Sequence, residues 1–188
     1  MTADWIPLGL AAALFAMAFF YVIGQFNGFV ALRNHAAEAW SNIDTELKRR
    51  HDLIPNLVAT VRGYAAHESA VLEEVVRLRT ARMANSGPVA GQIDDENRLA
   101  AAVQQLLAVV EGYPDLRADR GFLALQQELV NTEDRIQAAR RFYNGNIRDY
   151  RNKYEGFPTN LIARLFGLGP LEFLAIEPAV RTNPAVGG

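Results

Sequence analysis

Residues 122–157, FLALQQELVNTEDRIQAARRFYNGNIRDYRNKYEGF, decide the fold class of this chain. Large apolar side chains recur every seven residues through this stretch, and a second set fills the alternate positions of the same seam. A seven-residue repeat places its members on one stripe of an α-helix, and a stripe of this length is typical of antiparallel helix packing. The apolar character weakens at the next seam positions, Asn146 and Lys153. The repeat comprises Phe122, Leu129, Ile136, Tyr143, Tyr150 and Phe157, and the alternate positions are Leu125, Thr132 and Ala139.

Helical periodicity also dominates the sequence before this stretch. A first helix is expected to end at about Asp52, because Pro55 suits the first turn of a helix and breaks or kinks a helix interior. Whether Pro55 breaks the helix or only bends it stays open. A second helix covers residues 53–83 and precedes a loop at residues 85–88, and a third ends at the Gly-Tyr-Pro-Asp turn of residues 112–115. The apolar positions are Ala36, Trp40, Ile43 and Leu47 in the first helix, Leu57, Val61, Tyr64, Val71, Leu72, Val75 and Leu78 in the second, and Leu99, Val103, Leu106 and Val110 in the third.

These four helices predict an all-α fold. Short connections make an antiparallel up-down-up-down bundle, packed like a coiled coil, the simplest arrangement. We expect a short tail at residues 1–4, a transmembrane helix with its juxtamembrane extension at residues 5–30, and the helical bundle at residues 31–157. A short amphipathic segment at residues 158–174 and a flexible tail at residues 175–188 complete the predicted organisation.

Residues 5–32 contain no charged side chain and form the expected membrane anchor. A hydrocarbon core about 30 Å thick requires ~20 apolar residues of helix. A cleaved signal peptide is the alternative, but nothing basic precedes the run and the run is longer than a signal-peptide core. Arg33 follows the run and no Lys or Arg precedes it, so the positive-inside rule predicts an outside N-terminus and a cytoplasmic C-terminal domain. The anchor residues are Trp5, Ile6, Leu14, Phe19, Phe20 and Ile23.

Small residues line one face of this apolar run. Gly9 and Ala13 lie four positions apart, and Gly24 and Gly28 form a GxxxG motif. Such spacing allows two helix backbones to approach closely in lipid, which makes these four residues candidates for helix association. The alternative is that Gly and Ala are simply frequent in spanning helices.

A second amphipathic element follows the heptad stretch. A short helix after Pro158 carries Leu161, Ile162, Leu165 and Phe166 on one face. Four antiparallel helices return the chain to the membrane side, so this face is a candidate for the bilayer interface. Packing against the end of the bundle is the alternative.

Composition and motifs give no reason to expect an enzyme. The 188-residue chain has no cysteine, which excludes a disulfide scaffold, a thiol nucleophile and a thiolate metal site. A formal net charge of −2 argues against nucleic-acid binding. His35, His51 and His67 lack metal-ligand spacing, and no phosphate-binding glycine motif or nucleophile elbow occurs. We therefore expect no catalytic residues, no cofactor, no metal site and no nucleic-acid partner.

Polar residues gather instead at the predicted helix ends. A basic cluster at residues 48–51 lies about 20–25 Å beyond Arg33 at 1.5 Å per residue, farther than the Debye length of ~8 Å, so its attraction to acidic lipid is weak. A solvated helix end, where cations are favourable, is one interpretation. A contact with a neighbouring subunit is the other. The candidate inter-subunit contacts are Lys48, Arg49, Arg50, Asp52, Glu111 and Asp115.

Several blocks of this sequence resemble the LemA family. They are EAWSNID at residues 38–44, LKRRHDLIPNLV at residues 47–58, EGYPDLR at residues 111–117 and FPTN at residues 157–160. The resemblance implies a single-pass protein of the bacterial inner membrane with a cytoplasmic antiparallel helical bundle and no enzymatic activity. It also implies two functional associations: a relative in magnetosome-forming bacteria is linked to membrane invagination, and some members are encoded near membrane metalloproteases.

Two functional hypotheses follow from these observations. In the first, the chain is a membrane-anchored scaffold that forms homo-oligomers, contacts membrane lipid and organises or shapes the inner membrane. In the second, it is an adaptor that presents partners or substrates to a membrane protease or an envelope stress system. Particle size of the full-length protein separates the two.

Overall fold

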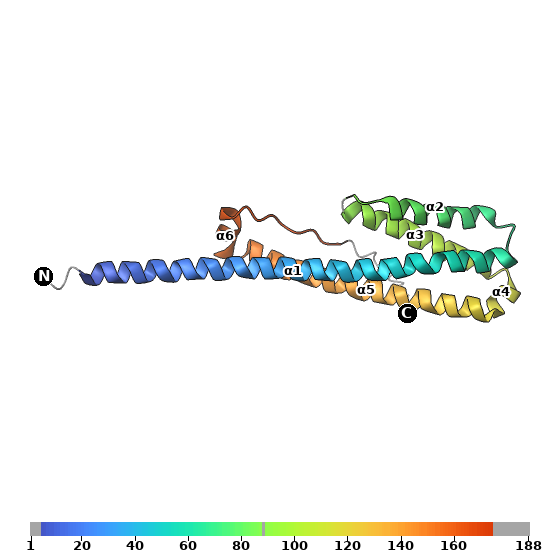
Figure 1. Ribbon diagram of the computed structural model, residues 1–188, viewed down its shortest axis with the longest axis horizontal. Helices are drawn as coiled ribbons and strands as arrows, with labels where there is room; N and C mark the ends of the chain where they lie inside the picture. Colours follow the sequence, from blue (N-terminus) through green and yellow to red (C-terminus); the bar gives the residue numbers. More distant parts are fainter. Residues whose placement is uncertain (1–4, 88, 175–188) are drawn as a thin grey trace, which may run out of the picture. The chain divides into compact units, whose positions relative to one another are not determined.

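The computed structural model describes residues 5–87 and 89–174, and all regular elements in these ranges are α-helices. The all-α prediction is therefore confirmed. Residues 1–4 and 175–188, for which short and flexible tails were predicted, lie outside the described residues. The helices in chain order are α1 (Trp5–Tyr64), α2 (Ser69–Ala84), α3 (Val89–Val110), α4 (Pro114–Ala118), α5 (Arg120–Glu155) and α6 (Thr159–Leu165), as Figure 1 shows.

α1 continues through the proline at which we expected a boundary. The predicted helix end at about Asp52 is wrong, because α1 extends to Tyr64 with Pro55 inside it. Proline has no N–H, so the carbonyl of His51, four residues earlier, loses its helical donor. The Nε of Arg79 donates a hydrogen bond to that carbonyl at 2.8 Å. A side chain of α2 thus satisfies the acceptor that the proline leaves free.

The single helix predicted over residues 53–83 is wrong as well, because the chain turns at residues 65–68 between α1 and α2. In this turn the N–H of Glu68 donates to the carbonyl of Ala65, which is fully buried. The hydroxyl of Tyr113 donates to the Glu68 carboxylate at 3.1 Å and ties the turn to the chain beyond α3. The helical periodicity continues across the interruption because both helices bury apolar residues in one core.

The described chain divides into two compact units. Unit 1 contains residues 5–41 and 142–173, and unit 2 contains residues 42–87, 89–141 and 174. Each unit has its own buried apolar cluster.

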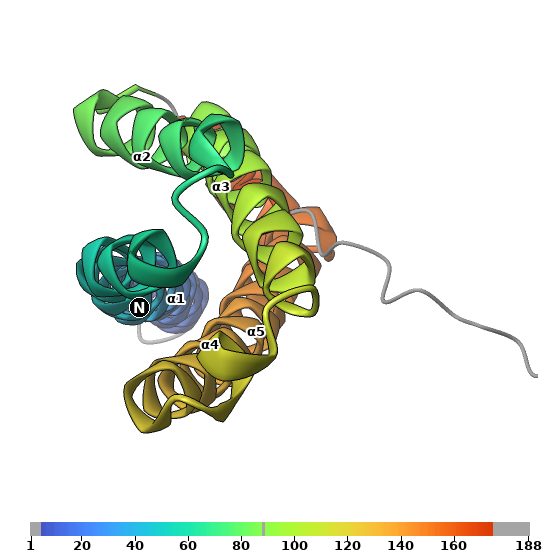
Figure 2. The same cartoon turned by 90° about the vertical axis from the view of Figure 1, so that its right-hand side faces the viewer.

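Unit 2 has a largely aliphatic core to which α1, α2, α3, α4 and α5 all contribute. α2 and α3 lie side by side as a helical hairpin in both views (Figures 1 and 2). Every apolar position predicted for the third helix is buried in this core. α4 was predicted only as a turn, but it buries its central leucine, Leu116. The main core residues are Ile54, Leu57 and Val61 of α1, Leu72 and Val75 of α2, Leu99, Val103, Leu106 and Val110 of α3, Leu116 of α4, and Phe122 and Leu129 of α5.

Unit 1 has a small aromatic core. The rings of Phe29 and Tyr150 meet edge to face with centroids 5.7 Å apart, and Ala163 of α6 completes the buried cluster. The hydroxyl of Tyr150 donates to the carbonyl of Gly169 at 2.7 Å. The heptad stripe of α5 is therefore buried at Phe122, Leu129, Ile136 and Tyr150 and half-buried at Tyr143, whereas Phe157 lies beyond the end of α5 and is 83% exposed. The expectation that Phe157 continues the buried stripe is wrong.

Candidate functional site

The first part of α1 has the length and composition of a membrane span. Its most apolar 18-residue window has a mean hydropathy of 2.0, and no residue of that window is buried in the protein. Leu14, Phe19, Phe20 and Ile23 of the predicted anchor are exposed. So many exposed apolar side chains on one helix suit a hydrocarbon environment. The side chains of Trp5 and Ile6, the other two anchor residues, lie outside the described part.

Three of the four small residues proposed for helix association have open surroundings. A side chain added at Gly9 or Gly24 would meet no atom within 4 Å, and Ala13 is exposed. Gly28 differs, because a Cβ there would collide with the Nζ of Lys153 in the same chain. Gly28 thus makes room for a side chain of α5, and the other three positions are available to a second helix.

The predicted amphipathic face of α6 is divided between two environments. Ile162 is buried in unit 1, and the ring of Phe166 lies 4.7 Å from the ring of Phe26, centroid to centroid. Leu161 and Leu165 remain exposed, the latter by 74%. One side of this face thus packs on α1 and the other side is exposed. Contact of the exposed side with the bilayer interface stays a prediction.

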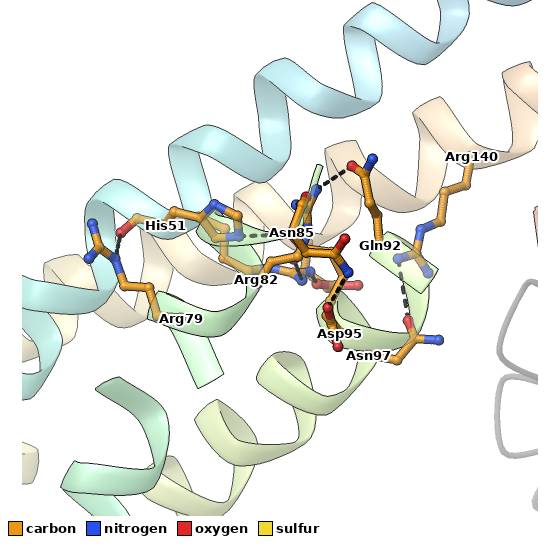
Figure 3. A network of polar contacts seen from close by, with 11 residues as sticks. His51, Arg79, Arg82, Asn85, Gln92, Asp95, Asn97 and Arg140 are labelled. Atoms are coloured by element: carbon orange, nitrogen blue, oxygen red, sulfur yellow. Dashed lines mark hydrogen bonds and ion pairs between the residues drawn. The ribbon is translucent and has the colours of Figure 1, made fainter. Parts of the chain in front are cut away.

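A fully buried carboxylate lies at the polar centre of unit 2. Glu96 of α3 has 0% exposed surface. One of its oxygens lies 2.8 Å from the Nε2 of His51 and 2.7 Å from the Nε of Arg82, and the other lies 3.5 Å from the Nη1 of Arg50. α1, α2 and α3 thus each contribute a charged or titratable side chain to a single buried cluster (Figure 3).

Further polar contacts extend this cluster to α5 and to the loop after α2 (Figure 3). Arg50 also pairs with Glu133 of α5, so its guanidinium joins two carboxylates from two helices. Arg82 donates to the side chain of Gln92 at 3.1 Å. The remaining pairs are Asn85 with Asp95 at 2.6 Å and Arg140 with Asn97 at 3.4 Å.

This buried ion cluster favours one register of the helices. A buried charge is costly unless it is paired, so only the alignment that brings Glu96 to its cationic partners is tolerated. Each charged group around Glu96 has an ion-pair partner within the chain. Among the residues described, no group of three or more His, Asp or Glu side chains is placed to hold a metal ion.

The sequence analysis missed Glu96 and Arg82, although the sequence contains a signal. Arg50, Arg82 and Glu96 each continue the spacing of three and four residues that defines the buried stripe of their helix. Charged residues of opposite sign at such positions on different helices indicate a buried ion cluster. The sequence analysis interprets the basic residues 48–51, which include Arg50, as a solvated helix end or a contact with a neighbouring subunit.

One of the residues predicted to contact a second subunit lies in the interior of unit 2. Arg50 is buried and pairs within its own chain, so it offers no surface to a second subunit. The predicted helix end at Arg50 and Asp52 is wrong because α1 continues past both. Lys48, Arg49 and Asp52 are exposed along α1, and Glu111 and Asp115 are exposed next to the ends of α3 and α4. Their role as inter-subunit contacts stays a prediction.

An open groove runs between α3 and α5 of unit 2. Two adjoining cavities, about 680 and 130 Å³ in volume, share Gln104, Leu107 and Val130 as lining residues. Leu123 and Val130, seven residues apart on α5, are each 49% exposed there. Exposed leucine and valine at helical spacing form an apolar strip that another helix can cover.

Comparison with known proteins identifies relatives along most of the chain. The sequence model of the LemA family matches residues 39–187. The magnetosome protein MamQ of Magnetospirillum gryphiswaldense is 22% identical over 201 residues, which covers 93% of this chain and 74% of MamQ. Magnetosome protein MamQ 2 of Paramagnetospirillum magneticum is 24% identical, with 82% and 66% covered. Protein LemA of Metamycoplasma hominis is 25% identical, with 87% and 78% covered. The chain thus spans about two thirds to three quarters of the length of these relatives.

Proposed function

Since this chain belongs to the LemA family, we propose that it is a non-enzymatic scaffold of the bacterial inner membrane, whose copies associate laterally and organise or shape the bilayer. The family and the exposed apolar part of α1 indicate a membrane-associated protein. Two relatives are named magnetosome proteins, which is in keeping with a role at a membrane.

The groove between α3 and α5 is the observation that carries the proposed self-association. Its apolar strip of Leu123 and Val130 lies on the surface of unit 2, and the half-buried Leu107 and the charged Glu111 and Arg117 are among the lining of the groove. Burial of apolar surface contributes roughly 25 cal/mol per Å², so covering the strip with a helix of a second copy is favourable. An apolar centre with a polar rim is also the usual anatomy of a protein interface.

The anchor strengthens a weak contact of this kind. Copies held in one membrane meet at a high effective concentration, so modest affinities suffice for assembly. The open backbone at Gly9 and Gly24 supplies a second contact within lipid. Together these two surfaces can propagate an array in the plane of the membrane.

Particle size of the full-length protein, extracted with its lipid retained, tests the proposal. Multi-angle light scattering and electron microscopy should find large uniform assemblies. A monodisperse single subunit under these conditions would contradict self-association.

A pair of matched variants localises the contact. Val130→Lys places a cation in the groove and should reduce assembly size, because a lysine buried in an apolar contact is costly. Ala124→Lys adds the same charge at an exposed position of α5 that does not line the groove and should assemble as the wild type does. Equal behaviour of the two variants would remove the groove from the proposal.

The second candidate function is an adaptor for a membrane protease or an envelope stress system. The groove is the observation that favours this function, because its apolar strip can bind a helix of an unlike protein as readily as a helix of a second copy. Crosslinking from position 123, which also lines the groove, should then capture one stoichiometric unlike partner in cells, and Val130→Lys should abolish that product.

The proposed orientation has an outside N-terminus and cytoplasmic unit 2. The chain has no cysteine, so single substitutions can be labelled without background. An impermeant maleimide applied to intact spheroplasts should label the Asp4→Cys variant and should leave the Ser86→Cys variant unlabelled until the membrane is opened. The reverse pattern would overturn the orientation.

A further inference from the structure

An unpaired lysine lies beside the apolar part of α1. Lys153 of α5 places its Nζ 5.1 Å from the centre of the Phe29 ring and against the backbone at Gly28. No carboxylate in the described part of the chain lies within ion-pair distance of this ammonium group. The Lys153 side chain is half-buried. The side chain is thus a partly desolvated cation without a counter-ion from its own unit.

An apolar groove of unit 1 begins about two helical turns from Gly28, toward the N-terminus of α1. Its volume is about 430 Å³, and its lining includes Leu14, Met17 and Tyr21 of α1 together with Pro158, Leu161 and Ile162 at α6. Val22, the last α1 residue of this lining, lies six residues before Gly28, about 9 Å along the helix. The cation and the groove therefore follow each other along the membrane-spanning part of α1.

The distance from the cation to the far end of the groove matches one leaflet of a bilayer. From Gly28 to Leu14 the helix rises about 21 Å, and half of a bilayer with its headgroups is roughly 20–22 Å thick. We propose that Lys153 and this groove together bind one anionic phospholipid, with the phosphate on the Lys153 ammonium and a hydrocarbon chain between α1 and α6.

The charges favour a lipid over the spanning helix of a second copy. Residues 5–32 contain no charged side chain, so that helix of another copy offers Lys153 no carboxylate at this depth. An acidic lipid supplies both parts of the match, an anion near the headgroup level and an apolar chain beneath it. Gly28 contributes by leaving the space into which the ammonium group fits.

Native mass spectrometry of the full-length protein, extracted in mild detergent and titrated with defined lipids, tests the site. The wild type should retain one phosphatidylglycerol in preference to phosphatidylcholine with the same acyl chains. Lys153→Gln should weaken this binding about tenfold, because a charge-assisted contact is lost, and Lys153→Arg should preserve it. Arg148→Gln is the matched control, since it removes one positive charge at an exposed position of α5. Equal losses in Lys153→Gln and Arg148→Gln, or no loss in either, would overturn the proposal.

A second measurement examines the hydrocarbon chain and does not depend on the lysine variants. Phosphatidylglycerol with a photoreactive acyl chain should label peptides that contain Met17 and Leu161, and Ala18→Phe, which fills the groove, should reduce this labelling. Excess unlabelled phosphatidylglycerol should compete, whereas its soluble headgroup without chains should not. Labelling spread evenly along residues 7–32 would contradict a defined site. The site requires only the anchor and not self-association, so Lys153→Gln should leave the assembly size unchanged, and failure of one proposal does not imply failure of the other.

Discussion

Unit 1 and unit 2 hold their helices together by different chemistry. Unit 2 combines an aliphatic core with a fully buried carboxylate that receives partners from other helices. Unit 1 has only a small core, in which the rings of Phe29 and Tyr150 meet and the Tyr150 hydroxyl bonds to a backbone carbonyl. Burial of aliphatic side chains stabilises the packed helices without selecting one alignment, and the ion cluster selects the alignment.

An aromatic core suits unit 1, because this unit contains the apolar part of α1. Unit 1 includes the apolar part of α1, and aromatic rings with a polar edge are typical of the level at which a membrane meets water. Tyrosine can bury its ring and still direct its hydroxyl to a polar partner. The comparison therefore predicts that charge changes damage unit 2 most, and that unit 1 responds to the loss of rings and hydroxyls.

Glu96→Ala should have the largest effect on stability. The substitution leaves Arg50 and Arg82 buried without their shared carboxylate, which costs about 3–5 kcal/mol. Urea unfolding of the full-length protein in detergent measures this loss. Glu73→Ala removes an exposed carboxylate of α2 and should change the free energy of unfolding by less than about 0.5 kcal/mol. Equal effects of the two substitutions would mean that the ion cluster contributes nothing to unit 2.

Trp40→Ala should have the next largest effect, in unit 1. The indole is half-buried, lies edge to face with Tyr143 at 6.1 Å between centroids, and lines a cleft of about 520 Å³. A fully buried tryptophan costs about 3–5 kcal/mol on truncation, so we expect about 2–3 kcal/mol here. Thermal unfolding checks this value, and Trp40→Phe should recover part of the loss. Wild-type melting of the alanine variant would show that the ring contact has no structural role.

Arg79→Met should cost about 1–2 kcal/mol by leaving the His51 carbonyl without a donor. The effect should depend on Pro55. In a Pro55→Ala background the helix regains its own N–H donor for that carbonyl, so Arg79→Met should then cost markedly less. A double-mutant cycle measures this coupling. Strict additivity of the two substitutions would contradict our explanation of why α1 continues through Pro55.

Tyr150→Phe should have the smallest effect, about 1 kcal/mol, through loss of the hydrogen bond to Gly169. It should also change the response to alkaline pH. Burial raises the pKa of Tyr150 above its ordinary value of about 10. Between these two pKa values the folded state holds a proton that the unfolded state has released, so stability is complete below pH ~10 and declines as the pH rises through the raised pKa. Urea unfolding at a series of alkaline pH values should show a shallower decline for Tyr150→Phe, and an unchanged decline would contradict this origin.

Periodicity in the sequence was sufficient for the all-α class, the buried stripes of α3 and of most of α5, and the apolar anchor. Each depends on spacing within one helix, such as the seven residues between Phe122 and Leu129, and local geometry translates that spacing directly into a face. The polar seam positions of Arg50 and Glu96 were also visible in principle.

Contacts between distant residues decided the rest. α1 passes Pro55 because Arg79, 28 positions from His51, reaches the free carbonyl, and Arg50 is interior because Glu96, 46 positions away, neutralises it. Gly28 is a third example. The GxxxG motif predicts helix association, whereas in the fold Gly28 leaves room for the side chain of Lys153. Local sequence determines which face of a helix is apolar. Whether a proline, a charge or a glycine is tolerated depends on the partner that the fold brings to it, because the cost of an unpaired buried group exceeds any local preference.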